Sequence, residues 1–223
     1  MVRCDGIAQW FAQLVPGRHL EPFLDVVDDD QSTHARRQIG VPVALNVGDF
    51  LVGEGYRLLG EIGKAEMTAV AAQGHVTLSR GQGRELLWVR NPEPLPSIQV
   101  LEIFRQKTAA AFEVALRLGA ILGGADEGTH NVLCKYSEAL GIAYQIKDDL
   151  EDFKGDADSN DLEQVRLSLI LAIAHKRAGG ADKKRIAALI RSGAPEGADE
   201  VHEIVRELGV LDKTDDLLEA YKE

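Results

Sequence analysis

Three aspartates in one short segment, Asp148, Asp149 and Asp152, are the residues of this sequence best suited to chemistry. In a helix, this spacing brings Asp148 and Asp152 onto one face, with Asp149 at its shoulder. Their carboxylates repel one another unless cations lie between them. Rigidly held oxygen ligands suit Mg²⁺, which typically binds through one or two carboxylates together with the phosphates of a substrate. The segment therefore predicts a magnesium site for a substrate that carries a diphosphate.

The alternative is that these aspartates form only a solvated acidic face. The residues just before them argue against this interpretation, because they make the preceding helix apolar nearly all round, as in a buried helix. These residues are Leu140, Ile142, Ala143, Tyr144 and Ile146. Carboxylates that emerge from a buried helix usually point into a cavity, so we favour the metal site.

Other polar residues could bind a diphosphate. Lys107 and Thr108 lie in an otherwise apolar helical stretch, where an inward cation needs a compensating anion; the alternative is an outward, solvated lysine. Gln145 lies one turn before the aspartates and could donate to a phosphate or be a satisfied core amide. Arg36 and Arg37 could make bidentate phosphate contacts, although such pairs also occur on plain surfaces.

Composition predicts one soluble globular domain over residues 1–223. The 45% hydrophobic and 27% charged residues are ordinary, and the net charge of −11 argues against nucleic acid or an anionic membrane surface as a partner. Cys4 and Cys134 lack metal-ligand spacing, so we expect both to be reduced. No apolar run approaches the roughly 20 residues that span a bilayer, and no signal peptide is recognisable. The expected location is the cytoplasm, with no transmembrane segment.

Apolar residues recur at three-to-four spacing almost throughout, whereas strand-like alternation is scarce. We therefore predict an all-α fold. The predicted helices cover residues 7–14, 43–60, 65–79, 97–122, 127–154, 162–178, 182–191, 197–208 and 211–221.

The segment GIAYQIKDDLEDF, residues 141–153, resembles the second aspartate-rich motif of the trans-isoprenyl diphosphate synthases, the polyprenyl synthetase family. Five further segments resemble other motifs of that family in the same order along the chain. They are Gly17 to Pro22, Asp25-Val-Val-Asp28 followed by Arg36-Arg37, Asn46 to Leu51, Gly81 to Leu86, and Lys107-Thr108. Such an ordered series is hard to obtain by chance, so the chain is identified as a member of this family.

The resemblance implies the isoprenoid synthase fold, a single-domain bundle of antiparallel helices around a central cavity. It implies a prenyltransferase that condenses an allylic diphosphate with isopentenyl diphosphate, using about three Mg²⁺ ions. The implied metal ligands are Asp25, Asp28 and Asp29 in one cluster, and Asp148, Asp149 and Asp152 in the other. The implied substrate-binding residues are Arg18, Arg36, Arg37, Lys107, Thr108 and Gln145, with Lys107 also among the catalytic residues. The resemblance also implies a homodimer, as do the small residues of 48–55.

The sequence departs from the family pattern in two motifs. Leu24 and Asp25 stand where the family's first motif has two aspartates, and Glu21 stands where its glycine-rich box has an arginine. These changes keep two alternatives open: a terpene synthase-like lyase, which needs no second diphosphate site, and a noncatalytic subunit of a heteromeric synthase. All-helical nucleotide pyrophosphohydrolases rank below both, since their paired ExxE and ExxD motifs are not evident.

The spacing of motifs is also shorter than in the family, which places a whole helix between the glycine-rich box and the first aspartates. Here Pro22 and Asp25 are almost adjacent. We interpret this as segments absent near residues 22–25 and 63–65; the alternative is a degenerate member of the family. Product length is set in this family by bulky residues just before the first aspartates. Because we interpret a segment as absent at that place, Phe23 and Leu24 predict no product length.

Overall fold

The structure is a computed structural model that describes residues 41–154, 166–192 and 197–222, and every element assigned within these ranges is helical. The predicted all-α fold is therefore confirmed. The chain divides into two compact units, residues 1–64 and 65–223, which are described separately. The predicted helix at 7–14 lies outside the described residues, and so do six candidate site residues. These six are Arg18, Asp25, Asp28, Asp29, Arg36 and Arg37.

In the first unit, helix α4 (Val41–Ile62) covers the predicted helix at 43–60. Arg57 pairs with Glu54 at 2.8 Å and also with Glu61. The helix ends at Gly63, whose φ of 72° is readily adopted by glycine and whose amide donates to the carbonyl of Leu59. The next helix begins at Ala65, so the join at 63–64 is a short turn. The idea of absent segments stays a prediction.

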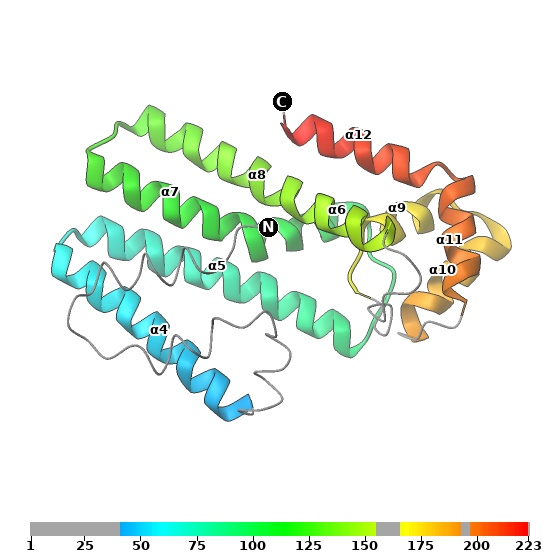
Figure 1. The fold of residues 1–223 in the computed structure, drawn as a ribbon, viewed down its shortest axis with the longest axis horizontal. Coiled ribbons are helices and arrows are strands. Elements are labelled where there is room, and N and C mark those ends of the chain that lie inside the picture. The colour runs from blue at the N-terminus through cyan, green and yellow to red at the C-terminus, as the bar shows by residue number, and fades with distance from the viewer. Residues whose placement is uncertain (1–40, 155–165, 193–196, 223) are drawn as a thin grey trace. The chain divides into compact units, whose positions relative to one another are not determined.

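The second unit contains three long helical rods that pack side by side with alternating directions (Figure 1). The middle rod is one helix in which a π-helical turn replaces five residues of α-helix. Gly124, with φ 71°, ends this rod, and the amide of Ala125 then donates to the Ala120 carbonyl at 2.9 Å. The elements are α5 (Ala65–Arg90), α6 (Ser97–Phe104), the π-turn η1 (Arg105–Ala109), α7 (Ala110–Gly123) and α8 (Glu127–Lys154).

Four shorter helices follow in the part of the second unit that the structure describes. The first three gather near the C-terminal end of α8, and the last runs back along α8 (Figure 1). They are α9 (Leu169–Arg177), α10 (Gly180–Ser192), α11 (Ala198–Glu207) and α12 (Val210–Lys222). One apolar core joins them to α6 and α8, with almost no solvent exposure of Phe104, Ile146, Leu169, Ile170, Ile186 and Val205. This core fixes α9 against the segment of α8 that carries the aspartates.

Three predicted helices differ from the structure. Helix α5 continues to Arg90, whereas we predicted that it ends at residue 79. Helix α9 begins at Leu169, because Ser168 is extended and caps it, whereas we predicted helix from residue 162. The third difference is the π-turn inside the helix predicted at 97–122.

The described part of the chain has no helix that is both long enough and apolar enough to cross a membrane. Cys134 is a free, partly buried cysteine whose thiol lies 3.4 Å from a carboxylate oxygen of Glu113. Burial raises the pKa of Cys134, which keeps the thiol protonated. Cys4 lies outside the described residues.

Candidate active site

The face of α8 that carries the aspartates is a regular stripe. Gly141, Gln145, Asp148 and Asp152 follow one another at spacings of four, three and four residues, so they lie on one side of the helix. We call these four residues the α8 stripe. Asp148 is partly buried, whereas Asp152 is exposed and lies 3.4 Å from Arg166. The helical spacing expected for the aspartates is thus present.

The surroundings of Asp148 disfavour its negative charge. Burial, followed by the negative charges of Asp152 and Glu151, raises the pKa of Asp148 above its ordinary value. The positive charges of Lys147 and Lys107 oppose this change. A cation placed between Asp148 and Asp152 would relieve the same repulsion, so the stripe has the electrostatic character of a cation site.

Asp149 lies beside the stripe and contacts a different helix. Its Oδ2 accepts hydrogen bonds from the backbone amides of Leu169 at 2.7 Å and Ile170 at 3.1 Å. The Oγ of Ser168 accepts from the amide of Leu171, so two side chains cap the start of α9. Burial raises the pKa of Asp149 to about 6, although the hydrogen bonds from Ser168 and these amides act in the opposite direction.

Sequence reasoning missed this capping contact of Asp149. Ser168 before the apolar run that starts at Leu169 was a signal for a helix start. Nothing local, however, indicated a second acceptor 20 residues upstream. The role of Asp149 as a metal ligand stays a prediction.

Lys107, in the π-turn, points to an acidic partner on α5. Its Nζ lies 2.6 Å from Glu85 Oε1, and the two side chains are only 18% and 19% exposed. The same Nζ lies 5.5 Å from the centre of the Phe104 ring, in cation–π range. Lys107 is therefore not a solvated surface lysine. Glu85 is the compensating anion that an inward lysine requires. The sequence alone did not identify Glu85 as this partner.

The Lys107–Glu85 pair predicts measurable coupling in stability. In a double-mutant cycle with Lys107→Met and Glu85→Gln, we expect a coupling free energy of about 1 to 2 kcal/mol, because each change leaves a poorly hydrated charge without its partner. Urea unfolding of the four proteins measures it.

The matched control is Lys147 with Glu151, an exposed pair on α8 at 3.3 Å. Its coupling should stay below about 0.5 kcal/mol. Equal coupling in the two cycles would show that the partial burial of Lys107 has no energetic consequence.

Three elements thus converge on one region: α5 with Glu85, the π-turn with Lys107 and Thr108, and the α8 stripe. The π-turn packs against both helices, and the charge of Lys107 acts on Asp148. Thr108 is partly buried beside Lys107. The arrangement places a cation next to carboxylates, which suits a ligand that brings both negative charge and metal.

The fit of Mg²⁺ to these residues depends on what the ligand contributes. Within residues 41–154, 166–192 and 197–222, no group of three or more acidic, histidine or cysteine side chains is placed to hold a metal. Asp148 and Asp152 together offer two carboxylates. That number suits Mg²⁺, which completes its shell with water and substrate phosphates. The donors fit a cation that is shared with a diphosphate.

Comparison with known proteins places the chain in a family. The family model for polyprenyl synthetase matches residues 25–208, which include the π-turn and the α8 stripe but not Arg18. A short chain isoprenyl diphosphate synthase from Methanothermobacter thermautotrophicus is 26% identical over 202 residues, which are 84% of this chain and 62% of that protein. The chain thus spans about six tenths of that relative's length.

Solved structures agree in fold. The decaprenyl diphosphate synthase of Rhodobacter capsulatus superposes with a TM-score of 0.78 at 26% identity, covering 88% of this chain and 64% of that one. A polyprenyl synthase from Caulobacter crescentus CB15, in complex with calcium and isoprenyl diphosphate, has a TM-score of 0.68 at 26% identity and covers 81% and 56%. The fold is thus the isoprenoid synthase fold. The chain belongs to the polyprenyl synthetase family.

Proposed function

We propose that this chain is a Mg²⁺-dependent prenyltransferase that condenses an allylic diphosphate with isopentenyl diphosphate into a longer polyprenyl diphosphate. The observation that carries the proposal is that the π-turn with Lys107 packs against the face of α8 that carries Gly141, Asp148 and Asp152, so a cation and two carboxylates could share one diphosphate. The related synthases, which are named for short-chain and decaprenyl products, support the same class of reaction.

The residues divide into a metal-holding and a phosphate-holding set. Asp148 and Asp152, with Asp149 as a further predicted ligand, would hold Mg²⁺, which when bound neutralises the charge on the departing diphosphate. The calcium and isoprenyl diphosphate of the Caulobacter protein support a divalent cation beside such a ligand. Lys107, Thr108 and Gln145 would donate to phosphate oxygens. The remaining predicted set, outside the described residues, is Asp25, Asp28 and Asp29 for further Mg²⁺, and Arg18, Arg36 and Arg37 for phosphates.

The chain's part in the reaction is to hold charge and exclude water. The carbon–oxygen bond of the allylic diphosphate breaks and its electron pair leaves with the diphosphate, which Lys107 would help to stabilise. The double bond of isopentenyl diphosphate attacks the allylic cation, and a carbon–carbon bond forms. The proton is then lost to the departed diphosphate. An apolar pocket would keep water from the cation until the proton is lost.

We also propose that the protein is a cytoplasmic homodimer. The dimer is expected from the family and from the small residues of 48–55. Sedimentation equilibrium of the full chain measures the assembly state. A monomer at micromolar concentration would contradict the dimer without affecting the proposed reaction.

The decisive experiment separates three activities. The chain is incubated with Mg²⁺ and dimethylallyl, geranyl or farnesyl diphosphate, with and without labelled isopentenyl diphosphate. We expect labelled, longer diphosphates, and their loss when the metal is chelated. Hydrocarbons formed without isopentenyl diphosphate would instead indicate a lyase. No turnover in any reaction would indicate a noncatalytic subunit.

A further inference from the structure

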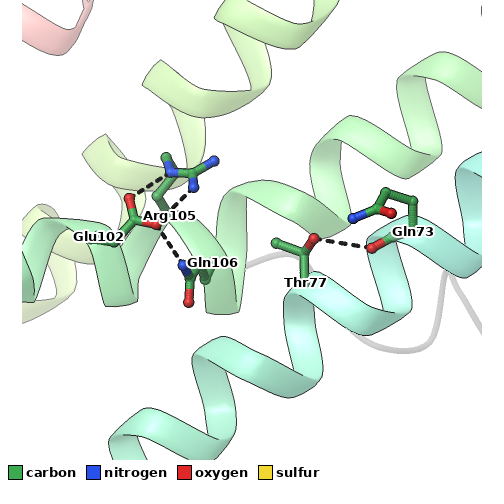
Figure 2. Close-up of polar contacts among 5 residues, drawn as sticks. All are labelled: Gln73, Thr77, Glu102, Arg105 and Gln106. Atoms are coloured by element: carbon green, nitrogen blue, oxygen red, sulfur yellow. Dashed lines mark hydrogen bonds and ion pairs between the residues drawn. The ribbon is translucent and has the colours of Figure 1, made fainter.

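The π-turn is held at its start by side chains of its own rod. Glu102 accepts two hydrogen bonds from Arg105, at 2.8 and 2.7 Å, and one from Gln106 Nε2 at 2.5 Å (Figure 2). These contacts fix Arg105 and Gln106, the first two residues of the turn, which directly precede Lys107. A π-turn is a costly irregularity in a helix and often occurs at functional sites. Its persistence here requires support from neighbouring helices.

Gly81 on α5 provides the first support. A Cβ built on Gly81 would lie 2.5 Å from the backbone nitrogen of Lys107, 2.7 Å from the Gln106 carbonyl carbon and 2.7 Å from the Gln106 Cβ. Two of these atoms are backbone, so no side-chain rotation could relieve the clash. The backbone of the π-turn occupies the space that any larger residue at position 81 would need. Glu85, the partner of Lys107, lies one turn further along α5.

Gly141 on α8 provides the second support. A Cβ there would lie 2.4 Å from the Ala109 Cα, 2.6 Å from its nitrogen and 2.6 Å from its Cβ. Ala109 is the last residue of the π-turn. Gly141 is also the first residue of the α8 stripe, so this contact sets the distance between the turn and the face that carries Asp148.

We propose that Gly81 and Gly141 form a glycine clasp that sets the register of the π-turn and thereby positions Lys107, whose Nζ pairs with Glu85, next to the α8 stripe. Both are positioning residues, because they act through Lys107 and have no side chain to contact a substrate. The inference rests on the proposed function, in which Lys107 binds the allylic diphosphate. A methyl group at either glycine must displace the turn, and a shift of about 1 Å in a binding group costs about 100-fold in rate.

The chain offers matched controls on α5. Gly83 has open space where its Cβ would lie, so Gly83→Ala tests the effect of alanine in this helix without a clash. Gly74 is also tightly packed, but the atoms nearest its Cβ position belong to α7: Val114 Cγ2 at 2.0 Å, Val114 Cβ at 3.5 Å and the Ala110 carbonyl oxygen at 3.8 Å. Gly74→Ala therefore tests a clash of α5 with α7, which is a merely structural change.

Steady-state kinetics of the full chain with Mg²⁺, geranyl diphosphate and isopentenyl diphosphate test the clasp. We expect Gly81→Ala and Gly141→Ala to lower kcat/KM for geranyl diphosphate by about 10- to 100-fold. Gly83→Ala should stay within about 2-fold of the wild type.

The readout specific to positioning is epistasis with Lys107. In a Lys107→Ala background, Gly81→Ala should cause little further loss, because the group that it displaces is already gone. Gly74→Ala should cause the same fold-loss in both backgrounds. If the losses from Gly81→Ala and Lys107→Ala multiply, as those of independent sites do, the clasp does not act through Lys107 and the inference is overturned.

Hydrogen exchange separates this inference from the proposed function. If the wild type has no transferase activity, the proposed function fails, but the clasp still predicts faster exchange of the 105–109 amides in Gly81→Ala and Gly141→Ala than in Gly83→Ala. Unchanged exchange would overturn it.

A milder change tests the clasp if an alanine variant does not fold. Ala109→Gly removes the Cβ that faces Gly141, and Ala111→Gly is its exposed control on α7. The clasp predicts faster exchange at 105–109 for Ala109→Gly only. Equal exchange in these two variants would contradict it.

Discussion

Replacing Asp148 with asparagine is expected to lower kcat by about 100- to 1000-fold, the loss typical of removing one electrostatic stabiliser of a transition state. The reason is that Asp148 is partly buried and lies on the face that would hold the cation. The charges of Lys107 and Asp152 both influence its carboxylate. Asparagine keeps the shape but not the charge. Asp152→Asn should act in the same direction. Rates of labelled isopentenyl diphosphate incorporation at saturating substrate measure both effects.

The control for this prediction is Glu151→Gln. Glu151 lies between the two aspartates in sequence, but its side chain is 63% exposed and pairs with Lys147. We expect a change of no more than about 2-fold, as for other surface substitutions. If Glu151→Gln and Asp148→Asn reduce kcat equally, the general acidity of the segment matters, and the α8 stripe is not the metal-holding face.

Asp149→Ala should chiefly destabilise the protein. It removes a partly buried acceptor from two amides at the start of α9 and leaves both donors unsatisfied, which we expect to cost about 2 to 4 kcal/mol in the free energy of unfolding. Asp149→Asn should cost less, because an amide oxygen still accepts from these donors. Urea unfolding followed by circular dichroism measures both values.

The matched variant for stability is Asp152→Ala, three residues later on the same helix. Asp152 is exposed and lies 3.4 Å from the exposed Arg166, so its loss should cost less than about 0.5 kcal/mol. Comparable destabilisation by Asp149→Ala and Asp152→Ala would mean that the contact with α9 contributes nothing to folding.

Much of the candidate site was predictable from residue spacing. The i, i+4 relation of Asp148 and Asp152 is a local property of a helix, and α8 covers the range predicted for it, residues 127–154. The residues around Lys107 left its direction open, and only the family resemblance favoured an inward position. The residues whose partners lie far along the chain were not predictable in this way. Glu85 as the partner of Lys107 is the clearest example, at a separation of 22 residues.

Glycine shows why helix ends were less predictable. In sequence, Gly81 and Gly83 look alike, and both weaken an isolated helix by roughly 1 kcal/mol relative to alanine. In the structure α5 continues through both, but only Gly81 lies against the π-turn, with no room for a side chain. The cost in helix propensity is offset by a close backbone approach, which a one-dimensional pattern does not record.

The sequence by itself determined the all-α fold, the family and the row of acidic residues on one helical face, because helical periodicity is set by residues three and four apart. Tertiary structure alone decided that Asp149 caps α9, that Glu85 pairs with Lys107, and that a π-turn lies between Gly81 and Gly141. These contacts join residues separated by 20 or more positions. They depend on which backbones can approach closely, and local spacing carries no information about that distance.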